Sequence, residues 1–182
     1  MSFLWLGCLS FATLYLFDRL KMQGKNVPLL FALGCTGIFA GSFGCFFAGN
    51  VRFILWPWMR AILLLLAAAE GLVMLWALFF ALPKGTYGGN SSATVDRGLY
   101  ALCRHPGVLC FAEMHIYLWL LSGRDMMLAA AILFTACDVL HVYVQDKIYF
   151  PKTLHGYEDY KKTTPFLIPN RASIDRCIKT FK

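Results

Sequence analysis

Long apolar stretches separated by shorter polar segments dominate the chain. A membrane-spanning helix needs roughly 20 predominantly apolar residues, and several stretches approach or reach that length. These stretches cover about residues 3–17, 27–48, 58–82, 107–122 and 126–144. The pattern predicts an all-α integral membrane protein with about five transmembrane helices.

The polar segments mark the connections between these helices. The first polar segment covers residues 18–26, where we expect a loop. The longest covers residues 83–106, whereas residues 123–125 fit a tight turn between two helices. Because no internal repeat or low-complexity tract divides the chain, residues 1–182 are expected to form a single membrane domain.

Composition supports a membrane protein and argues against a soluble domain. Hydrophobic residues make up 59% of the chain, charged residues make up 15%, and the mean hydropathy is +0.60. A soluble domain typically carries about 25% charged residues, and one core of this size could not bury so much apolar surface. A lipid bilayer accepts that surface without cost.

The formal net charge of +7 is explained by the membrane rather than by nucleic acid. Basic residues collect on the cytoplasmic side of membrane proteins, where anionic headgroups favour them. With the N-terminus outside, the outward-facing loops hold Arg52, Arg60 and Arg124. The other loops and the C-terminal tail are richer in lysine and arginine. We therefore expect a cytoplasmic C-terminus, membrane lipids as partners and no nucleic-acid partner.

Glycine and cysteine residues in the apolar stretches are interpreted as packing residues. The second stretch holds glycines at positions 34, 37, 41 and 44, and small residues at such spacing let helices approach closely, within one chain or between chains. The seven cysteines fall mostly in apolar stretches and form no CxxC motif. We expect them to be small hydrophobic groups, with neither a disulfide framework nor a metal site. The oligomeric state is left open.

Ionisable residues inside the apolar stretches are functional candidates, because a charge in lipid is costly. Glu70 lies in the third stretch and is interpreted either as a functional group or as a protonated or paired carboxyl group that joins helices. Glu113 and His115, in the fourth stretch, are two residues apart and point to different sides. Asp138 and His141, in the fifth stretch, are three residues apart and share a helical face.

The segment before the fourth stretch, residues 98–106, reads GLYALCRHP. Proline in the first turn begins a helix cleanly, and the free backbone N–H groups of that turn favour an anionic group. Arg104 and His105 add hydrogen-bond donors beside it. The alternative is that Arg104 only extends to the lipid headgroups.

A second polar motif follows the fifth stretch. Asp146 comes directly after Gln145, and Tyr157 and Tyr160 share one face of a short predicted helix. Residues 165–169 then read PFLIP. Aromatic rings with a polar group suit a nucleoside pocket and equally suit the membrane interface.

Together, the two motifs resemble those of the isoprenylcysteine carboxyl methyltransferase family, a broad family of membrane methyltransferases related to the phospholipid N-methyltransferases. Its first motif is Gly-x-Tyr-x-x-x-Arg-His-Pro before a membrane helix. Its second is an acidic pair, then Tyr-x-x-Tyr twelve residues on, then Pro-x-x-x-Pro, which is the spacing in this chain. The resemblance covers about residues 84–170 and places the site in segments 96–113 and 145–170.

The resemblance implies an enzyme, a methyltransferase that uses S-adenosylmethionine and acts on a lipophilic or membrane-embedded small molecule or lipid. The cofactor would bind at the cytoplasmic face, and the acceptor would be a thiol, an amine or a carboxylate. Arg104 and Asp146 are the implied catalytic residues, with Asp146 as the best candidate for a general base. The implied cofactor site comprises Tyr100, Arg104, His105, Pro106, Glu113, Asp146, Tyr157 and Tyr160.

Five positions depart from the family pattern. Val108 and Cys110 stand where the family usually has tyrosine and glycine, Gln145 replaces the first acidic residue, and Phe166 replaces an arginine. The glycine that the family usually has shortly before the first tyrosine is displaced, as Gly156. The identity of the methyl acceptor is therefore not predicted, and these departures leave open whether activity is altered or lost.

Three other functions fit parts of the same pattern. A membrane protein of this fold without methyltransfer activity is one, because of the departures. A reductase that binds a nicotinamide dinucleotide is the second, although such chains have more spans. The third is a b-type haem protein with His115 and His141 as axial ligands from adjacent helices.

Overall fold

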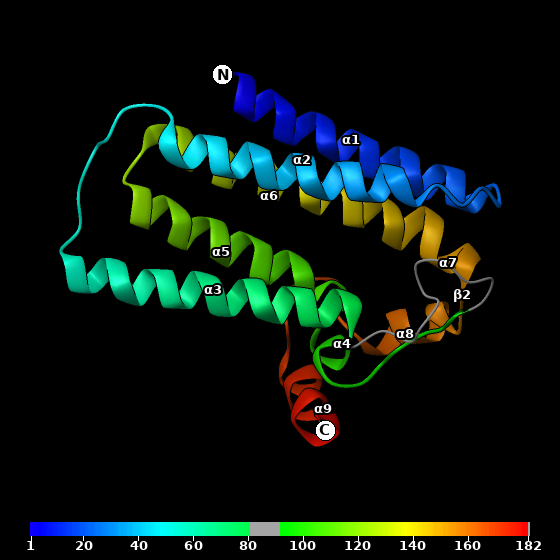
Figure 1. Cartoon of the computed structure of the whole chain (residues 1–182). Coiled ribbons are helices and arrows are strands. Elements are labelled where there is room, and N and C mark those ends of the chain that lie inside the picture. Colours follow the sequence, from blue (N-terminus) through cyan, green and yellow to red (C-terminus); the bar gives the residue numbers. More distant parts are fainter. Residues whose placement is uncertain (81–91, 182) are drawn as a thin grey trace.

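The computed structural model describes residues 1–80 and 92–181, and most of these residues are helical (Figure 1). The long helices are α1 (Ser2–Met22), α2 (Pro28–Phe47), α3 (Pro57–Phe79), α5 (Pro106–Ser122) and α6 (Asp125–Val144). The shorter elements are β1 (Ser92–Ala93), α4 (Leu99–Leu102), η1 (Gln145–Tyr149), α7 (Phe150–Thr153), β2 (Leu154–His155), α8 (Tyr157–Thr163) and α9 (Arg171–Thr180).

The long helices alternate in direction and lie side by side as a bundle (Figure 1). α1 packs against α2 and α6, and α5 packs between α6 and α3. One end of the bundle holds the α2–α3 connection and the α5–α6 turn, where Gly123 adopts φ +64°. The other end gathers α4, α7 and α8 (Figure 1). The two sequence motifs therefore meet at one end of the bundle.

Within residues 1–80 and 92–181, four helices are long and apolar enough to cross a membrane: Ser2–Met22, Pro28–Phe47, Pro57–Ala77 and Asp125–Thr153. The expected helical membrane bundle is confirmed to this extent. The remaining predicted span, α5, is apolar but only 17 residues long, which is short for the roughly 20 residues that a crossing needs.

α1 is longer than the sequence pattern predicted. The expected loop over residues 18–26 is wrong in its first part, because the helix continues to Met22. Asp18 is only 14% exposed and pairs with His141 of α6. A charged residue can extend an apolar helix when its partner lies on a neighbouring helix, and hydropathy does not reveal that partner.

The glycines of α2 bring α1 and α2 into close contact, as predicted. A Cβ atom at Gly41 would lie 2.9 Å from the carbonyl oxygen of Phe3 and 3.0 Å from the backbone nitrogen of Gly7. Both atoms belong to the backbone of α1, so no side-chain movement could make room. Small residues are therefore required where the two helices meet.

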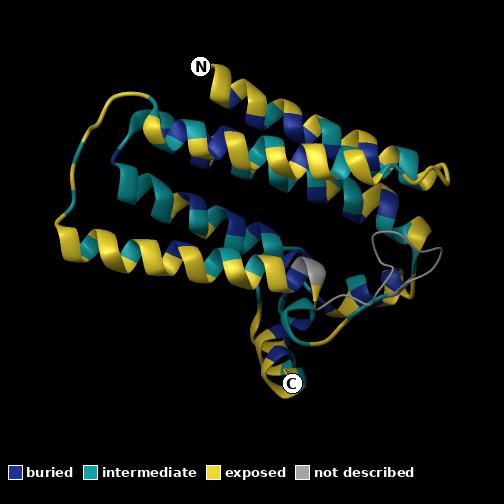
Figure 2. Cartoon of the chain, in the orientation of Figure 1, coloured by how far each residue is buried: buried dark blue, intermediate teal, exposed yellow. Residues whose placement is uncertain are grey.

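Exposed positions line the outer sides of the bundle, most evidently along α3 (Figure 2), and many of them carry large apolar side chains. α3 packs on α5, and Leu65 and Leu72 of α3 are largely exposed. Such a surface is unfavourable in water and fits contact with lipid tails. The buried core lies between α1, α5 and α6 and includes Phe11, Phe111 and Phe134.

A two-residue parallel strand pair, which the all-α expectation did not include, joins segments far apart in the chain. Ser92 pairs with Leu154 and Ala93 with His155. Thr94 extends the contact, since its backbone nitrogen and its hydroxyl group both donate to the carbonyl oxygen of His155. The pair fixes residues 92–94 beside α7 and α8, at the end of the bundle where the motifs meet.

Candidate functional site

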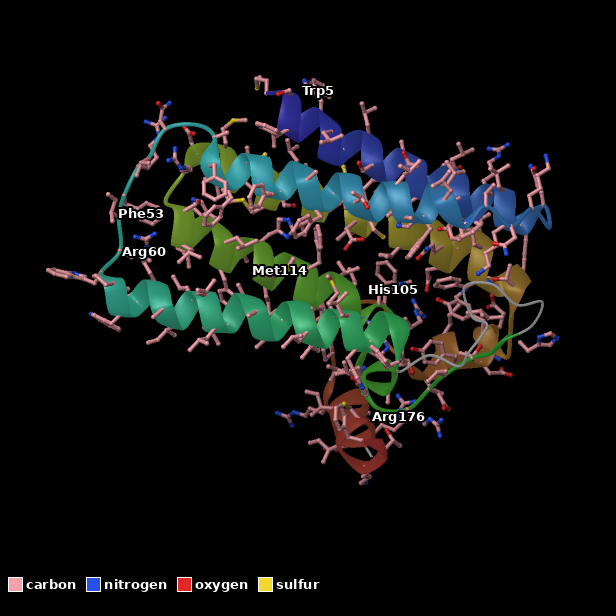
Figure 3. All side chains as sticks on the ribbon, viewed as in Figure 1. Trp5, Phe53, Arg60, His105, Met114 and Arg176 are labelled. Carbon is pink, nitrogen blue, oxygen red and sulfur yellow. The ribbon has the colours of Figure 1, made fainter. Side chains whose placement is uncertain are left out.

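Local backbone geometry positions both motifs at this end of the bundle. Gly98, at φ +58°, precedes α4, and Gly156, at φ +77°, precedes α8. Glycine adopts these conformations without the strain that a side chain would add. Pro106 occupies the first turn of α5, as predicted. The connection between α4 and α5 thus directs Arg104 toward Lys161 of α8 and Asp146 of η1, and it places His105 at this end of the bundle (Figure 3).

η1 is a π-helical turn that continues α6. Such turns insert one extra residue into a helix and are frequent at functional sites. Here the turn carries Asp146 inward, where its side chain is 2% exposed. Gln145, the preceding residue, instead contacts Asp18 of α1.

Asp146 is the centre of the site. Its Oδ1 accepts a hydrogen bond from the hydroxyl group of Tyr157 at 2.7 Å and lies 2.9 Å from Nε of Arg104. The Nε–H group is not aligned for a hydrogen bond, whereas Nη2 of Arg104 donates to Oδ2 at 3.4 Å. A buried carboxylate needs this compensation, because its desolvation is costly.

Arg104 connects Asp146 to the chain that surrounds it. Its Nη1 donates to the carbonyl oxygen of Lys161 at 3.2 Å, and its backbone nitrogen donates to the carbonyl oxygen of Pro165 at 3.0 Å. The ring of Phe166 lies 5.6 Å from the guanidinium carbon, in the range of a cation–π contact. Arg104 therefore does not simply extend to the headgroups, which was the alternative interpretation.

His105 lies beside the Arg104–Asp146 pair in an aromatic enclosure. Its ring is nearly parallel to that of Phe150, at 5.8 Å, and edge-on to that of Phe166, at 5.2 Å. Burial lowers the pKa of His105 below its ordinary value, and Asp146, 3.7 Å from Nε2, offsets only part of this effect. The imidazole is consequently neutral at physiological pH, and its Nε2 has no hydrogen-bond partner among the described residues.

Tyr157 and Tyr160 share one buried face of α8, as the sequence predicted, with ring centroids 5.8 Å apart. Burial, together with the hydrogen bond to Asp146, raises the pKa of Tyr157 above its ordinary range. Burial likewise raises the pKa of Tyr160, whose hydroxyl group donates to the carbonyl oxygen of Tyr100 at 2.6 Å. Tyr100 in turn donates to the carbonyl oxygen of Ala77, so this chain of contacts joins α8, α4 and α3.

Thr164 is a member of the site that sequence reasoning missed. It is almost fully buried, and its Oγ1 has no partner within the described part of the chain. A buried hydroxyl group without a hydrogen bond is unfavourable and calls for an explanation such as a bound group. Its position directly before Pro165 of the second motif was the signal that could have identified it.

Glu113, a predicted cofactor residue, lies apart from this cluster. Its carboxyl group approaches that of Glu70 across the contact between α5 and α3. This arrangement matches the interpretation of Glu70 as a paired carboxyl group that joins two helices. The structure thus brings together Tyr100, Arg104, His105, Asp146, Tyr157 and Tyr160, places Pro106 beside them in the first turn of α5, and leaves Glu113 outside.

Gln145 contacts a second polar cluster next to the site. Its Nε2 donates to Oδ2 of Asp18 at 2.6 Å, and Nε2 of His141 lies 2.9 Å from the same oxygen. A carboxylate from α1 therefore stands beside the motif position that lacks an acidic side chain. Sequence reasoning missed Asp18, because 127 positions separate it from Gln145.

The two histidines suggested as haem ligands are engaged in separate contacts. His115 is buried, with Nε2 3.0 Å from the hydroxyl oxygen of Ser42 and Nδ1 2.8 Å from the carbonyl oxygen of Phe111. His141 is paired with Asp18. Neither geometry favours axial ligation of one haem by both imidazoles.

Comparisons of the chain with known protein families, with curated proteins and with solved structures find no match. The chemistry of the site therefore rests on its own residues.

Proposed function

We propose that this protein is a membrane methyltransferase that binds S-adenosylmethionine and methylates a lipophilic acceptor. The observation that carries the proposal is the buried pair of Arg104 and Asp146, whose side chains are 10% and 2% exposed. An arginine next to a carboxylate is complementary to an amino-acid group, which carries a carboxylate and an ammonium. The resemblance of both motifs to the isoprenylcysteine carboxyl methyltransferase family points to the same cofactor.

The surrounding residues fit the rest of that cofactor. The neutral His105 offers Nε2, and Thr164 offers Oγ1, each buried and without a partner among the described residues. Tyr157 and Tyr160 present aromatic faces suited to an adenosine group and to the positive charge of a sulfonium. Arg104 would hold the carboxylate, and Asp146 would hold the ammonium.

Bound S-adenosylmethionine would supply an activated methyl group: the acceptor would form a bond to the methyl carbon as the bond from that carbon to sulfur breaks, and S-adenosylhomocysteine would leave. In-line placement is the main requirement of such a reaction. Arg104 and Asp146 contribute by orienting the cofactor. The rings of Phe150 and Phe166 exclude water, which favours attack by a thiol, amine or carboxylate that has lost its hydration. Asp146 is the candidate to accept a proton from a thiol or an ammonium acceptor.

The position of the site suits an acceptor that arrives from the bilayer. The site lies at the end of the bundle where the chain is richest in basic residues, so the positive-inside rule puts it at the cytoplasmic face. Exposed apolar side chains such as Leu140 and Tyr143 of α6 lie within two turns of η1. A lipid or lipophilic molecule would reach the site along this surface.

Transfer of a labelled methyl group tests the activity. Purified protein in lipid nanodiscs is incubated with methyl-labelled S-adenosylmethionine and with lipid extracts, a prenylated cysteine and a long-chain amine. We expect a labelled product that partitions into organic solvent, and mass analysis of that product identifies the acceptor. Arg104→Ala and Asp146→Asn should abolish labelling, whereas Lys162→Ala, a change at an exposed position of α8, should leave it unchanged.

A second function is favoured by one observation. Both oxygens of Asp146 are already engaged by Arg104 and Tyr157. The same contacts are expected if the cluster serves only to hold the α4–α5 connection, η1 and α8 together. A protein of this fold without methyltransfer activity would use the cluster in that way. Such a protein would give no labelled product with thiol, amine or carboxylate acceptors, even where it binds the cofactor.

A further inference from the structure

α9 is strongly amphipathic, more so than each of the long helices of the bundle, and the proposed cofactor site does not explain why. One side packs on α4 and buries Ser173 and Cys177. An adjacent side exposes Ile174, Ile178 and, just beyond the last turn, Phe181. Because residues three and four apart share a helical face, these three side chains form one apolar stripe, which we call the α9 stripe.

The α9 stripe continues the lipid-facing surface of α3. The ring of Phe181 stacks on that of Trp76 at 6.0 Å with an interplanar angle of 30°. Trp76 lies one turn before the end of α3 and is itself exposed. Tryptophan at the end of a membrane helix is typical of the headgroup level, so the stack places the end of α9 at that level.

α9 lies across the bundle and not along it. Figure 1 shows α9 nearly end-on in a view in which α3 runs across the page. The helix therefore lies close to the plane that a membrane surface would occupy. A capping box at its start, formed by Asn170 and Ser173, fixes where it begins.

Exposed charged side chains lie beside the α9 stripe: Arg171 and Lys179, with the carboxylate of Asp175 one helical turn from each of them. Arg171 and Lys179 are exposed and take part in none of the ion pairs found among residues 1–80 and 92–181. Arg176 is directed back to the carbonyl oxygen of Thr163 (Figure 3). Two cations and one carboxylate leave this side of α9 with a net positive charge, and a positive charge beside an apolar stripe is complementary to an anionic headgroup above an acyl chain.

We infer that α9 is an interfacial helix that binds an anionic phospholipid surface. The α9 stripe enters the boundary between headgroups and acyl chains, next to Trp76, and Arg171 and Lys179 bind the phosphate groups. Two hydrogen bonds join α9 to the segment before α4 and to α8. The backbone nitrogen of Gly98 donates to the hydroxyl group of Thr180, and Arg176 donates to Thr163 of α8. The lipid surface thereby holds α4 and α8 in place.

Photocrosslinking in nanodiscs of defined composition tests this inference. Ile174, Ile178 and Ala172 are replaced one at a time by p-benzoylphenylalanine in the full chain, in phosphatidylcholine alone or mixed with phosphatidylglycerol. Ala172 is exposed but lies on a different side of α9, which makes it the matched control. Adducts are identified by mass spectrometry.

We expect several-fold more lipid adducts at positions 174 and 178 than at 172. The phosphatidylglycerol adducts should decrease when Arg171→Gln and Lys179→Gln are combined. Trypsin cleavage after Lys179 in the unmodified chain gives an independent readout, and phosphatidylglycerol should slow it. Equal adducts at all three positions, crosslinks mainly between two copies of the chain, or yields that do not respond to phosphatidylglycerol would each overturn the inference.

Discussion

Nε of Arg104 lies 2.9 Å from Oδ1 of Asp146, and both side chains are almost fully buried. The pair joins the segment before α5 to the π-helical turn after α6, and it also holds Tyr157 of α8. Whether or not a ligand binds there, so much buried charge makes the pair important for stability. Its energetics can be tested without knowledge of the substrate.

Removing one member of the pair should destabilise the protein strongly. Asp146→Asn leaves the Arg104 charge buried without a counter-charge, and we expect a loss of about 3–5 kcal/mol in the free energy of unfolding. Tyr157→Phe removes one hydrogen bond and should cost about 1–3 kcal/mol. Denaturant titration in mixed micelles measures both values. An Asp146→Asn variant as stable as the wild type would contradict the buried pair.

The stability of the protein should decrease in mild acid because of His105. Burial lowers the pKa of this imidazole in the folded state, so the unfolded chain binds a proton first as the pH falls. The contribution of the neutral His105 to the free energy of unfolding is complete above the ordinary histidine pKa of about 6.5. It is lost progressively as the pH decreases toward the lower pKa of the folded state. Comparing the pH dependence of the unfolding free energy of wild type and His105→Gln isolates this effect. Between about pH 7 and pH 5, a range around the ordinary histidine pKa, the unfolding free energy of the variant should change less with pH than that of the wild type. Identical changes in the two proteins would show that His105 is not responsible.

The close approach of α1 and α2 can be tested with two glycine substitutions, one at the contact between these helices and one at an open position elsewhere. Gly41→Ala would bring a Cβ atom to 2.9 Å from a backbone oxygen of α1, and we expect a destabilisation of about 1–3 kcal/mol. At Gly107, in the first turn of α5, a Cβ atom would meet nothing within 4 Å. Gly107→Ala should therefore be neutral or stabilising by up to about 1 kcal/mol. Unfolding titrations under one set of conditions compare the two variants, and equal effects would contradict the packing described for α2.

The contact between Gln145 and Asp18 predicts a compensating exchange. Gln145→Glu would place a second carboxylate beside Asp18, whose Oδ2 is 2.6 Å from the present amide nitrogen. We expect a loss of about 1–3 kcal/mol from repulsion and from the missing hydrogen bond. The double variant Asp18→Asn with Gln145→Glu restores one carboxylate and one amide, and most of the stability should return. Additive losses in this double-mutant cycle would show that the two side chains do not interact.

The sequence predicted the parts of this structure that depend on local pattern. Hydropathy located the long helices because lipid requires long apolar stretches, and the spacing of Tyr157 and Tyr160 indicated one buried face of a short helix. Pro106 marked the start of α5 for a similarly local reason. Arg104, His105 and Asp146 were expected in one site because the two segments that hold them resemble, in order and spacing, two motifs of one family.

Other features depend on contacts between distant segments, and the sequence did not reveal them. Asp18 remains helical because His141 and Gln145 pair with it across the bundle. Glu113 faces Glu70 rather than the site, since the rotation of α5 against α3 is decided by packing. The β1–β2 pair lacks any strand pattern, because two residues per strand are too few to carry one.

Binding of S-adenosylhomocysteine, the product form of the cofactor, tests the central claim most directly. Isothermal titration of the purified protein in nanodiscs is compared with Arg104→Ala, Tyr160→Ala and the surface control Lys162→Ala. We expect saturable binding by the wild type and by the control. Arg104→Ala should lose at least about tenfold in affinity, the equivalent of one charged hydrogen bond, and Tyr160→Ala should also bind more weakly. Absence of binding by the folded wild type, or unchanged affinity in both site variants, would contradict the assignment of this cluster as a cofactor site.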